Sequence, residues 1–409
     1  MAPNGGHRTG RAPFQISGVS RPAWRAYAAP VKASARERAR DRIEDVARHG
    51  HDLTTLWREA SEVLRPVVPH YLGACYYTLD PASLLITSHF NESMPELPPE
   101  WVAMEYYEDD VNKLVDIAQS PRGWSTLHEA TGGDPSGSPR WQANMGYGGD
   151  QELIAALRTP AGEAWGAIGL YREPGAPVFD DDEIGLVVDV APTLAAAARR
   201  GLLVGEATDP EGLDAPGLLV LSDDWELESS TPGTARWLAD FPDGDWETGD
   251  LPSAVLAVAG RALRSAERPG ESGKVAVARV LSRSGTWIVL HGAPLAGGAR
   301  RRVAVIIEPA HPARIVPLLM SAYELTAREQ AVTRLVLKGE STAQIAATLV
   351  VSPHTVQEHL KRIFEKTGVR SRRDLVGKVF FAHYEPRLRD NERRVPAGRP
   401  LRGGPMESV

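Results

Sequence analysis

The sequence has almost no cysteine: Cys75 is the single thiol among 409 residues. One cysteine cannot form a disulfide within the chain, and it cannot supply a cysteine-based zinc site. This sparse usage fits a reducing compartment. We expect Cys75 to be a small buried apolar residue rather than a redox sensor.

Long hydrophobic runs are absent as well. The N-terminus has no apolar segment of the kind that secretory signals contain. The apolar stretch over residues 186–198 is interrupted by Asp189 and Pro192, which disfavours a membrane-spanning helix. We therefore expect a cytoplasmic protein without membrane spans.

The signatures of enzymes and metal sites are also missing. We find no phosphate-binding glycine loop, no dinucleotide fingerprint after a strand, no G-x-S-x-G elbow and no HExxH. The pair His49 and His51 and the acidic run 180–183 lack a metal-specific spacing, and helix ends explain both. We predict no enzyme, no cofactor and no metal. An enzymatic first domain is the alternative of another class, and turnover by residues 43–204 alone would indicate it.

Charge is distributed unevenly along the chain, although the net charge is only -7. Residues 1–42 hold nine basic and two acidic side chains, and residues 323–378 hold ten and six. Residues 43–322 hold 21 basic and 41 acidic side chains. A polyanion would be repelled by this acidic body, so any contact with nucleic acid should be confined to the basic C-terminal module.

The length and composition predict several globular domains. Hydrophobic residues make up 42% of the chain, which is sufficient for real cores, and 409 residues exceed one ordinary core. The expected parts are a basic, disordered tail (1–42), a first domain (43–204), a second domain (216–315), a C-terminal domain (322–382) and a disordered tail (386–409).

The first domain shows helical patterns at both ends and strand patterns between them. Helices are expected at residues 53–64 and 183–200, and strands at 71–79, 84–89, 153–157 and 164–171. This layout predicts an antiparallel sheet flanked by helices. It resembles a GAF-type sensor domain.

The second domain has a similar mixture of elements. Strands are expected at residues 217–221, 226–230, 275–281, 286–291 and 303–307, and helices at 235–241 and 253–265. The order resembles a small PAS-like domain. The expected fold class is thus α+β for both sensor domains, followed by an all-α module.

Large aromatic residues are concentrated in the middle of the first domain, where a GAF-type fold would place its pocket. They are candidates for a ligand pocket, although large aromatics also simply fill cores. The candidates are Trp101, Tyr106, Tyr107, Trp124, Trp141, Tyr147 and Trp165.

The C-terminal module carries helix start and stop signals at short intervals. Thr326 with Glu329 and Ser341 with Gln344 match capping boxes, in which two side chains satisfy unpaired backbone N–H groups. Ser352 before Pro353 is a third start, and Gly368 is a stop. The module is therefore expected to contain four short helices.

The third of these helices has one apolar face and one polar face. Val356, Leu360, Ile363 and Phe364 should pack on the preceding helices. The opposite face should reach base edges in a major groove, with Gln357 suited to adenine, Glu358 to cytosine and Lys361 to guanine. Arg362, Lys366 and Arg372 are expected at phosphates. The full candidate set for DNA contact is Ser352, His354, Thr355, Gln357, Glu358, Lys361, Arg362, Lys366 and Arg372.

Motifs spaced through all four helices resemble the LuxR-type DNA-binding domain over about sixty residues. They are Leu325-Thr326-Ala327-Arg328-Glu329, Ile345-Ala346, Ser352-Pro353-His354-Thr355-Val356, His359-Leu360, Ile363-Phe364, Lys366, Gly368-Val369 and Ser371-Arg372. The resemblance implies a helix-turn-helix dimer on a two-fold operator. Family members often carry a basic residue after the Thr-Val pair, where this chain has Gln357, so the preferred DNA sequence is not implied.

These observations predict a sequence-specific transcriptional regulator that binds double-stranded DNA as a homodimer. The GAF-like and PAS-like half would sense a small ligand or a partner. In the alternative, this half only dimerises or recruits a protein partner such as RNA polymerase, with no ligand. A small molecule that shifts the thermal stability of the sensor half would distinguish the two.

Overall fold

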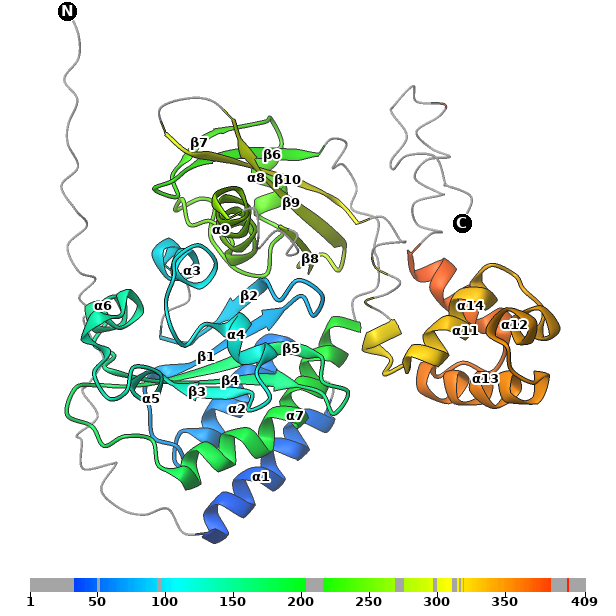
Figure 1. The fold of residues 1–409 in the computed structure, drawn as a ribbon, viewed down its shortest axis with the longest axis horizontal. Coiled ribbons are helices and arrows are strands. Elements are labelled where there is room, and N and C mark those ends of the chain that lie inside the picture. Colours follow the sequence, from blue (N-terminus) through cyan, green and yellow to red (C-terminus); the bar gives the residue numbers. More distant parts are fainter. Residues whose placement is uncertain are drawn as a thin grey trace, which may run out of the picture.

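A computed structural model describes residues 33–49, 52–93, 98–203, 216–268, 276–296, 300–310, 315, 318, 320–383 and 396. The described residues form two antiparallel sheets with their helices and a separate helical domain at the C-terminal end (Figure 1). The tail expected at 386–409 lies outside them except for Pro396, and so does most of the tail expected at 1–42.

The first sheet has five strands in the order β2-β1-β5-β4-β3. These strands are β1 (Tyr71–Leu79), β2 (Ile86–Phe90), β3 (Trp124–Thr126), β4 (Gln151–Arg158) and β5 (Ala164–Arg172). All of the pairs are antiparallel, so the expected antiparallel sheet is confirmed. Successive side chains point to opposite faces of a strand. Accordingly, Tyr76 stacks on Trp57 on one face, and the neighbouring Tyr77 joins the core on the other.

Three helices cover one face of this sheet: α1 (Ala33–Arg48), α2 (Leu53–Leu64) and α7 (Asp181–Leu203) (Figure 1). The boundary expected at residue 43 is wrong, because it falls inside α1. That helix begins at Ala33 and buries Ala39 and Ile43 against the same core as α7. Its high content of charge hid this short apolar face in the sequence.

The second sheet repeats the strand order of the first, as β7-β6-β10-β9-β8. Its strands are β6 (Gly217–Ser222), β7 (Leu227–Ser230), β8 (Val277–Leu281), β9 (Trp287–Leu295) and β10 (Arg302–Pro309). Two helices, α8 (Thr234–Leu238) and α9 (Ser253–Glu267), connect β7 to β8. All of its pairs are antiparallel too, which confirms the expected layout.

The helix α9 lies between the two domains. Every residue from Ser253 to Leu263 is buried, which is typical of a helix enclosed by protein on all sides. It packs on its own sheet and on α3 (Pro99–Tyr106) and β2 of the first domain, so one hydrophobic core runs through both domains. The two sheets therefore form one body (Figure 1).

Short helices and loops frame the remaining face of the first sheet. They are α4 (Leu114–Gln119), α5 (Leu127–Ala130), the 3-10 turn at Pro135–Gly137 and α6 (Pro139–Gly146). The sequence analysis did not predict α3, α4, α5, α6 or β3. Each of them is short and lacks a full period of apolar residues.

Polar groups are also buried where the two domains meet. The Asp80 carboxylate accepts hydrogen bonds from the Arg279 backbone N–H at 3.0 Å and from Arg279 Nε at 2.9 Å. The Asp243 carboxylate accepts a hydrogen bond from the backbone N–H of His89 at 2.9 Å. Buried polar groups are costly unless they are paired, so these contacts favour one arrangement of the two domains.

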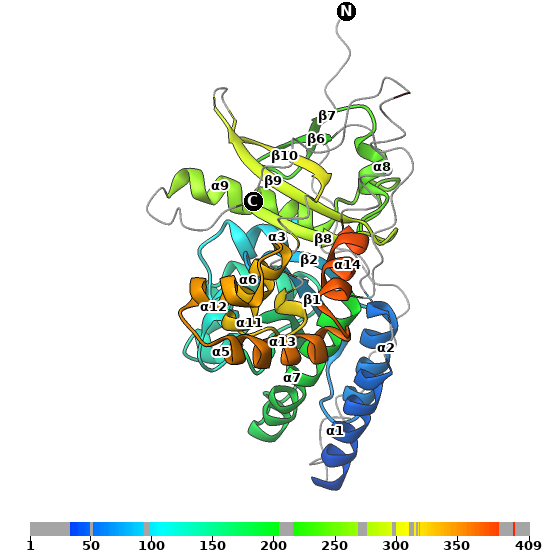
Figure 2. The ribbon, with the colours of Figure 1, turned by 90° about the vertical axis from the view of Figure 1, so that its right-hand side faces the viewer.

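The C-terminal domain contains α11 (Ala327–Leu337), α12 (Thr342–Leu349), α13 (Pro353–Thr367) and α14 (Arg372–His383), which confirms four helices (Figure 2). The segment before it carries Ile315, Leu318 and Ala322, which are buried together with Trp165 of the first domain and Trp287 of the second. This apolar cluster fixes the start of the C-terminal domain against the body.

We predict that Gly260→Leu separates the two sheet domains. A Cβ atom at Gly260 would lie 3.3 Å from the Cβ of Tyr106, so a larger side chain must displace α3. Overpacking of this kind costs about 1–3 kcal/mol. Urea unfolding should show a lower midpoint than for the control Gly185→Leu, because that helical glycine has open space around it. Equal midpoints for the two variants would contradict the tight contact of α3 with α9.

We further predict that Asp243→Asn raises stability at neutral pH. Burial raises the pKa of Asp243 from 3.8 to about 6, so the folded state retains a proton that the unfolded state loses between these values. Stability from this group is thus highest below pH 4 and falls by roughly 3 kcal/mol as the pH rises to 6. Burial lowers the pKa of the neighbouring His89 to about 3, so its ring stays neutral in this window. The difference in unfolding free energy between variant and parent should therefore grow from pH 4 to pH 6. A constant difference would contradict the assignment.

Candidate nucleic-acid interface and sensor cavity

The helices of the C-terminal domain begin and end at the residues that the sequence indicated. Thr326 and Glu329 form a complete capping box at α11, and Ser341 and Gln344 form another at α12. The Ser352 hydroxyl accepts a hydrogen bond from the backbone N–H of Thr355 at 3.0 Å. Gly368 ends α13 with a φ of 68°, a left-handed conformation that glycine adopts without strain. These predicted start and stop signals are confirmed.

The apolar face of α13 forms the core of this domain. Val356, Leu360 and Ile363 are buried in one cluster with Ile345 of α12 and Val332 of α11. This packing fixes the rotation of α13 about its own axis, so it also determines which side chains face outward.

The outward face of α13 is polar. His354, Gln357, Glu358, Lys361 and Arg362 are exposed along it. The Gln357 amide donates a hydrogen bond to the Thr342 hydroxyl at 3.2 Å, which directs this side chain toward the start of α12. Ser352 and Thr355 bond to each other at the N-terminus of α13, where they act first as caps.

Lys366 and Arg372, which were expected at phosphates, remain partly accessible and also bind groups of their own domain. Lys366 Nζ donates to the Glu329 carboxylate at 2.7 Å and to the Glu324 carbonyl at 2.8 Å. Arg372 donates to the Glu340 carbonyl at 2.8 Å and to the Thr342 hydroxyl at 3.0 Å. These bonds give both residues a structural role, and their contact with phosphate stays a prediction.

The charge of Glu329 depends on Lys366. Burial raises the pKa of Glu329, but the hydrogen bonds from Lys366 and from Thr326 outweigh burial and hold the pKa below its usual value. The ion pair thereby joins the start of α11 to the end of α13.

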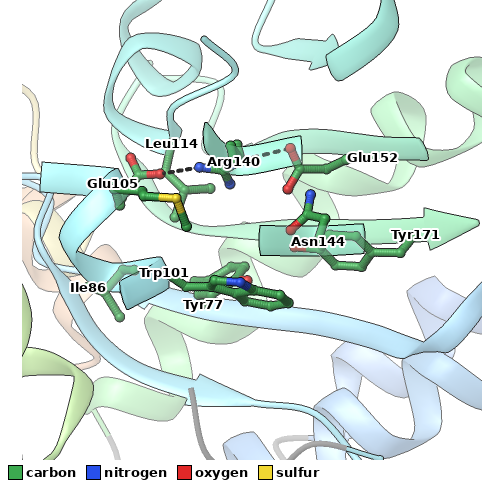
Figure 3. Close-up of a pocket in the computed structure, with 10 residues that line it drawn as sticks. Tyr77, Ile86, Trp101, Glu105, Leu114, Arg140, Asn144, Glu152 and Tyr171 are labelled. Carbon is green, nitrogen blue, oxygen red and sulfur yellow. Dashed lines mark hydrogen bonds and ion pairs between the residues drawn. The ribbon is translucent and has the colours of Figure 1, made fainter. Parts of the chain in front are cut away.

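A small cavity of about 20 Å³ lies in the first domain, between α3, α6 and the sheet (Figure 3). This volume is close to what one water molecule requires. The side chains that line it come from α3, α4, α6 and four strands of the sheet: Tyr77, Ile86, Trp101, Met104, Glu105, Leu114, Arg140, Asn144, Glu152 and Tyr171.

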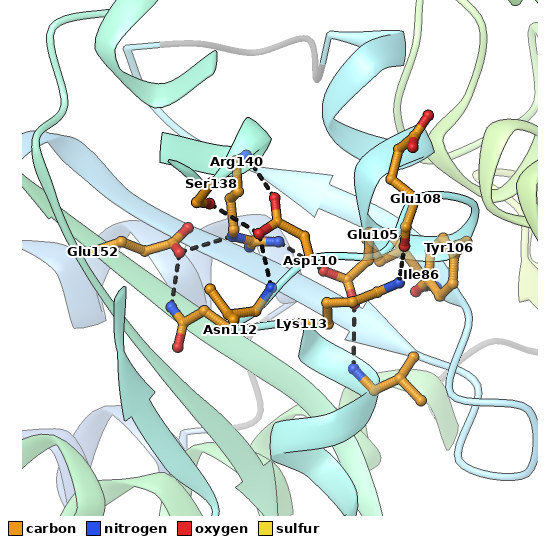
Figure 4. Close-up of polar contacts among 12 residues, drawn as sticks. Ile86, Glu105, Tyr106, Glu108, Asp110, Asn112, Lys113, Ser138, Arg140 and Glu152 are labelled. Atoms are coloured by element: carbon orange, nitrogen blue, oxygen red, sulfur yellow. Dashed lines mark hydrogen bonds and ion pairs between the residues drawn. The ribbon is translucent and has the colours of Figure 1, made fainter. Parts of the chain in front are cut away.

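A buried ion triad forms one wall of this cavity. Arg140 donates from Nε to Glu152 at 2.7 Å and from Nη1 to Glu105 at 3.0 Å (Figure 4). Burial raises the pKa of Glu105, and the two carboxylates hold the pKa of Arg140 well above its usual value although burial opposes this. The Asn112 amide also donates to Glu152, at 2.7 Å.

Several polar atoms beside the cavity lack a protein partner within the described part of the chain. They include the indole N–H of Trp101, the amide nitrogen of Asn144 and one carboxylate oxygen of Glu152. Because an unpaired buried polar atom is costly, these groups indicate a polar occupant such as water or a polar ligand atom.

The aromatic residues expected in one pocket are dispersed through the molecule. Trp101 lines the cavity, and Tyr147 packs edge-on against it with ring centroids 5.1 Å apart. The Trp141 indole donates a hydrogen bond to Asp150, and Trp124 lies under the Arg122 guanidinium. Trp165 belongs to the apolar cluster with Ile315, Leu318 and Ala322, which we call the linker cluster. Tyr106 and Tyr107 face the second domain, where Tyr107 contacts Trp225.

The sequence analysis missed Glu105, Arg140 and Glu152. They are widely separated along the chain, and no motif connects them. A charged Glu152 at the start of an otherwise apolar strand was the single available signal.

The remaining residues singled out in the sequence occupy ordinary structural positions. Cys75 is buried, as expected, and burial raises the pKa of its thiol to about 12. His49 Nδ1 lies 2.7 Å from the Asp45 carbonyl oxygen, and His51 is outside the described residues. Asp180 caps α7, and Glu183 accepts a hydrogen bond from Arg172. Within the described ranges, no group of three or more potential metal ligands gathers and no helix is long and apolar enough to cross a membrane.

We predict that Arg140→Met lowers the free energy of unfolding by about 3–5 kcal/mol, because it leaves two buried carboxylates without a counter-charge. Adding Glu105→Gln and Glu152→Gln should restore most of this loss. The control Arg122→Met breaks an exposed ion pair with Glu129 and should change stability by about 0–1 kcal/mol. Urea unfolding measures all three variants. A loss for Arg140→Met no larger than for the control would refute a buried triad.

Comparison with known proteins identifies the C-terminal domain. Residues 323–379 match the family described as "Bacterial regulatory proteins, luxR family". HTH-type transcriptional regulators of Mycobacterium bovis and Mycobacterium tuberculosis are each 50% identical to this chain over 55 residues. The aligned segment covers 13% of this chain and 6% of either relative, so this chain spans a small part of their length.

Similar solved structures include a phycoerythrobilin-bound GAF domain from a cyanobacterial phytochrome, with 15% identity and a TM-score of 0.29 over 41% of this chain and 96% of that one. A VqmA–ligand–DNA complex from Vibrio cholerae has 14% identity and a TM-score of 0.21, over 43% and 88% of the respective chains. Scores this low do not establish a shared fold. The family match and the four capped helices agree: residues 323–379 form a helix-turn-helix domain of the luxR family.

Proposed function

We propose that this chain is a sequence-specific, DNA-binding transcriptional regulator that acts as a homodimer and whose two-sheet body responds to a small ligand. The observation that carries the proposal is the geometry of α13. Its apolar face is fixed in the core of a luxR-family domain, and its polar face is free of other protein elements along most of its length.

In this proposal α13 lies in the major groove of the DNA. Lys361 is exposed and can donate to guanine, while Gln357 and Glu358 on the same face suit adenine and cytosine. Arg362 and His354 lie beside them and would contact the backbone or a flanking base. A second copy on the adjacent half-site would read the same sequence in the opposite direction.

The body is connected to α13 by a short chain of contacts. Arg199, at the end of α7, forms an ion pair with the Glu324 carboxylate. The Glu324 carbonyl in turn accepts the hydrogen bond from Lys366 of α13. A change in the body that moves α7 would therefore act on the position of α13, which is how a sensed signal would alter DNA binding.

We favour a ligand-responsive body because it encloses polar atoms that have no protein partner in the described residues, and a bound polar molecule would pair them; the cavity beside them holds about one water molecule. In the alternative, the body only dimerises or recruits a protein partner such as RNA polymerase. The extensive packing of α9 between the domains fits that alternative equally well, because it needs no ligand.

We predict that Lys361→Ala impairs DNA recognition, whereas Lys366→Ala impairs the stability of the domain. Lys361→Ala should leave thermal stability unchanged and should cost roughly 1–3 kcal/mol of binding to the preferred DNA sequence, with a relaxed preference. Lys366→Ala should lower the unfolding midpoint, because Glu329 loses its counter-charge. Scanning calorimetry and DNA titration on selected and random sequences measure both effects.

The control for this experiment is Lys338→Ala, which removes a positive charge from the end of α11, away from the outward face of α13. It should leave sequence preference intact. If Lys361→Ala weakens binding to selected and random DNA equally, α13 does not read base edges as proposed.

A further inference from the structure

A second, larger opening lies where the two sheet domains meet. It is a polar cleft of about 250 Å³ between the end of α3, the segment leading to α4, and α9. Its charged lining consists mainly of Asp109, Asp110, Lys113, Asp116, Arg261 and Arg264. The cavity inside the first domain accommodates about one water molecule, whereas this cleft has room for a small metabolite.

Arg261 is the unusual residue of the cleft. Its side chain is 6% exposed on the buried helix α9, and its Nε has no hydrogen-bond partner in the described part of the chain. The guanidinium faces the Tyr106 ring at 5.5 Å, and burial lowers the pKa of Arg261. Glu105 and Asp116 favour its charge from nearby, but no carboxylate forms a hydrogen bond with the guanidinium in the described part of the chain, and a bound anion would supply that bond.

The other cations of the cleft are already engaged. Arg264 donates to Asp109 at 2.9 Å and to the Tyr107 carbonyl at 2.9 Å. Lys113 donates to the Glu108 carbonyl at 2.6 Å (Figure 4). A bound anion would therefore contact Arg261.

The carboxylates decide what kind of anion fits. Asp110 accepts hydrogen bonds from the Ser138 hydroxyl and the Arg140 backbone N–H. The Asp116 side chain is exposed, and its charge acts on both Arg261 and Lys113, but it forms no side-chain hydrogen bond within the described residues. Glu105 is paired with Arg140, and Asp109 with Arg264 and Arg268. Arg261 and Asp116 are therefore the two opposite charges left without a side-chain hydrogen bond in the described part of the cleft, which favours a zwitterion over a phosphate or another dianion.

We propose that the cleft binds a small zwitterion of the α-amino acid class, with its carboxylate on Arg261 and its ammonium group toward Asp116. The role of this cleft as an effector site rests on the proposed function. Binding of the amino acid itself is measured without DNA. The ligand contacts Arg261 of α9 and Asp116 of α4 together, so it stabilises the contact between the two domains. Such a ligand would act on α7 and Arg199 through the first sheet, because the shared core lies on one face of that sheet and α7 packs on the other.

The test is thermal unfolding of the full chain with each of the twenty common L-α-amino acids added singly. At a hundredfold excess over its Kd, a bound amino acid should raise the unfolding midpoint by roughly 5 °C. The amine that lacks its carboxylate and the acid that lacks its amino group should each give little or no rise. Inorganic phosphate is the comparison for a simple anion site.

Three variants locate the effect. Arg261→Met should abolish the rise, and without ligand it should be at least as stable as the parent because it removes an unpaired buried charge. Asp116→Asn changes an exposed position. It should weaken the apparent affinity for the amino acid at least tenfold, so that the same rise in midpoint needs a correspondingly higher concentration. The control Arg300→Met removes an exposed arginine that pairs with Asp224, and neither residue lines the cleft, so it should keep the full response.

The outcomes separate cleanly. If phosphate raised the midpoint as much as the most effective amino acid, the cleft would be a site for simple anions and the zwitterion proposal would be wrong. No rise with any of the twenty amino acids, or a full response in Arg261→Met, would overturn the site. DNA binding by the same preparation is measured in parallel, so failure of the effector site remains distinct from failure of the proposed function.

Discussion

The burial of α9 between two sheets is the constraint on which the rest of the structure depends. A helix with eleven consecutive buried residues cannot be exposed to water without a large loss of apolar contact, so the two domains must act as one body. This arrangement encloses charges that would otherwise be solvated. Asp80 is paired with Arg279, and Asp243 receives the His89 backbone N–H, whereas Arg261 is left without an anion. The proposed effector site follows from the same burial.

The route from this body to DNA is short because the linker cluster and one ion pair leave little freedom at the junction. Trp165 and Trp287 come from different sheets and both contact the segment before α11. Glu324 then joins the body to the DNA-binding domain, since its carboxylate binds Arg199 and its carbonyl binds Lys366. A regulator built in this way would transmit a change in domain packing as a change in the position of α13.

The sequence allowed the C-terminal domain to be predicted almost completely, because its signals are local. The hydroxyl of Thr326 and the carboxylate of Glu329 lie one turn apart, so a capping box is visible in the chain itself. The strand hairpins were predicted for the same reason. The triad around Arg140 and the burial of Arg261 depend on residues brought together by tertiary packing, and no local pattern records them. Lys366 is a further example: its basic character suggested a phosphate contact, but no local pattern indicated its ion pair with Glu329.

The central claim is that the body holds two copies of α13 in a defined relation to DNA through Arg199 and Glu324. Selection of bound sequences from a random DNA pool, by the full chain and by Arg199→Met, tests it most directly. The account predicts an enriched two-fold motif with half-sites about one helical turn apart for the parent. For the variant it predicts the same half-site with a relaxed spacing. No enriched motif for either protein, or identical motifs and spacing for both, would contradict the account.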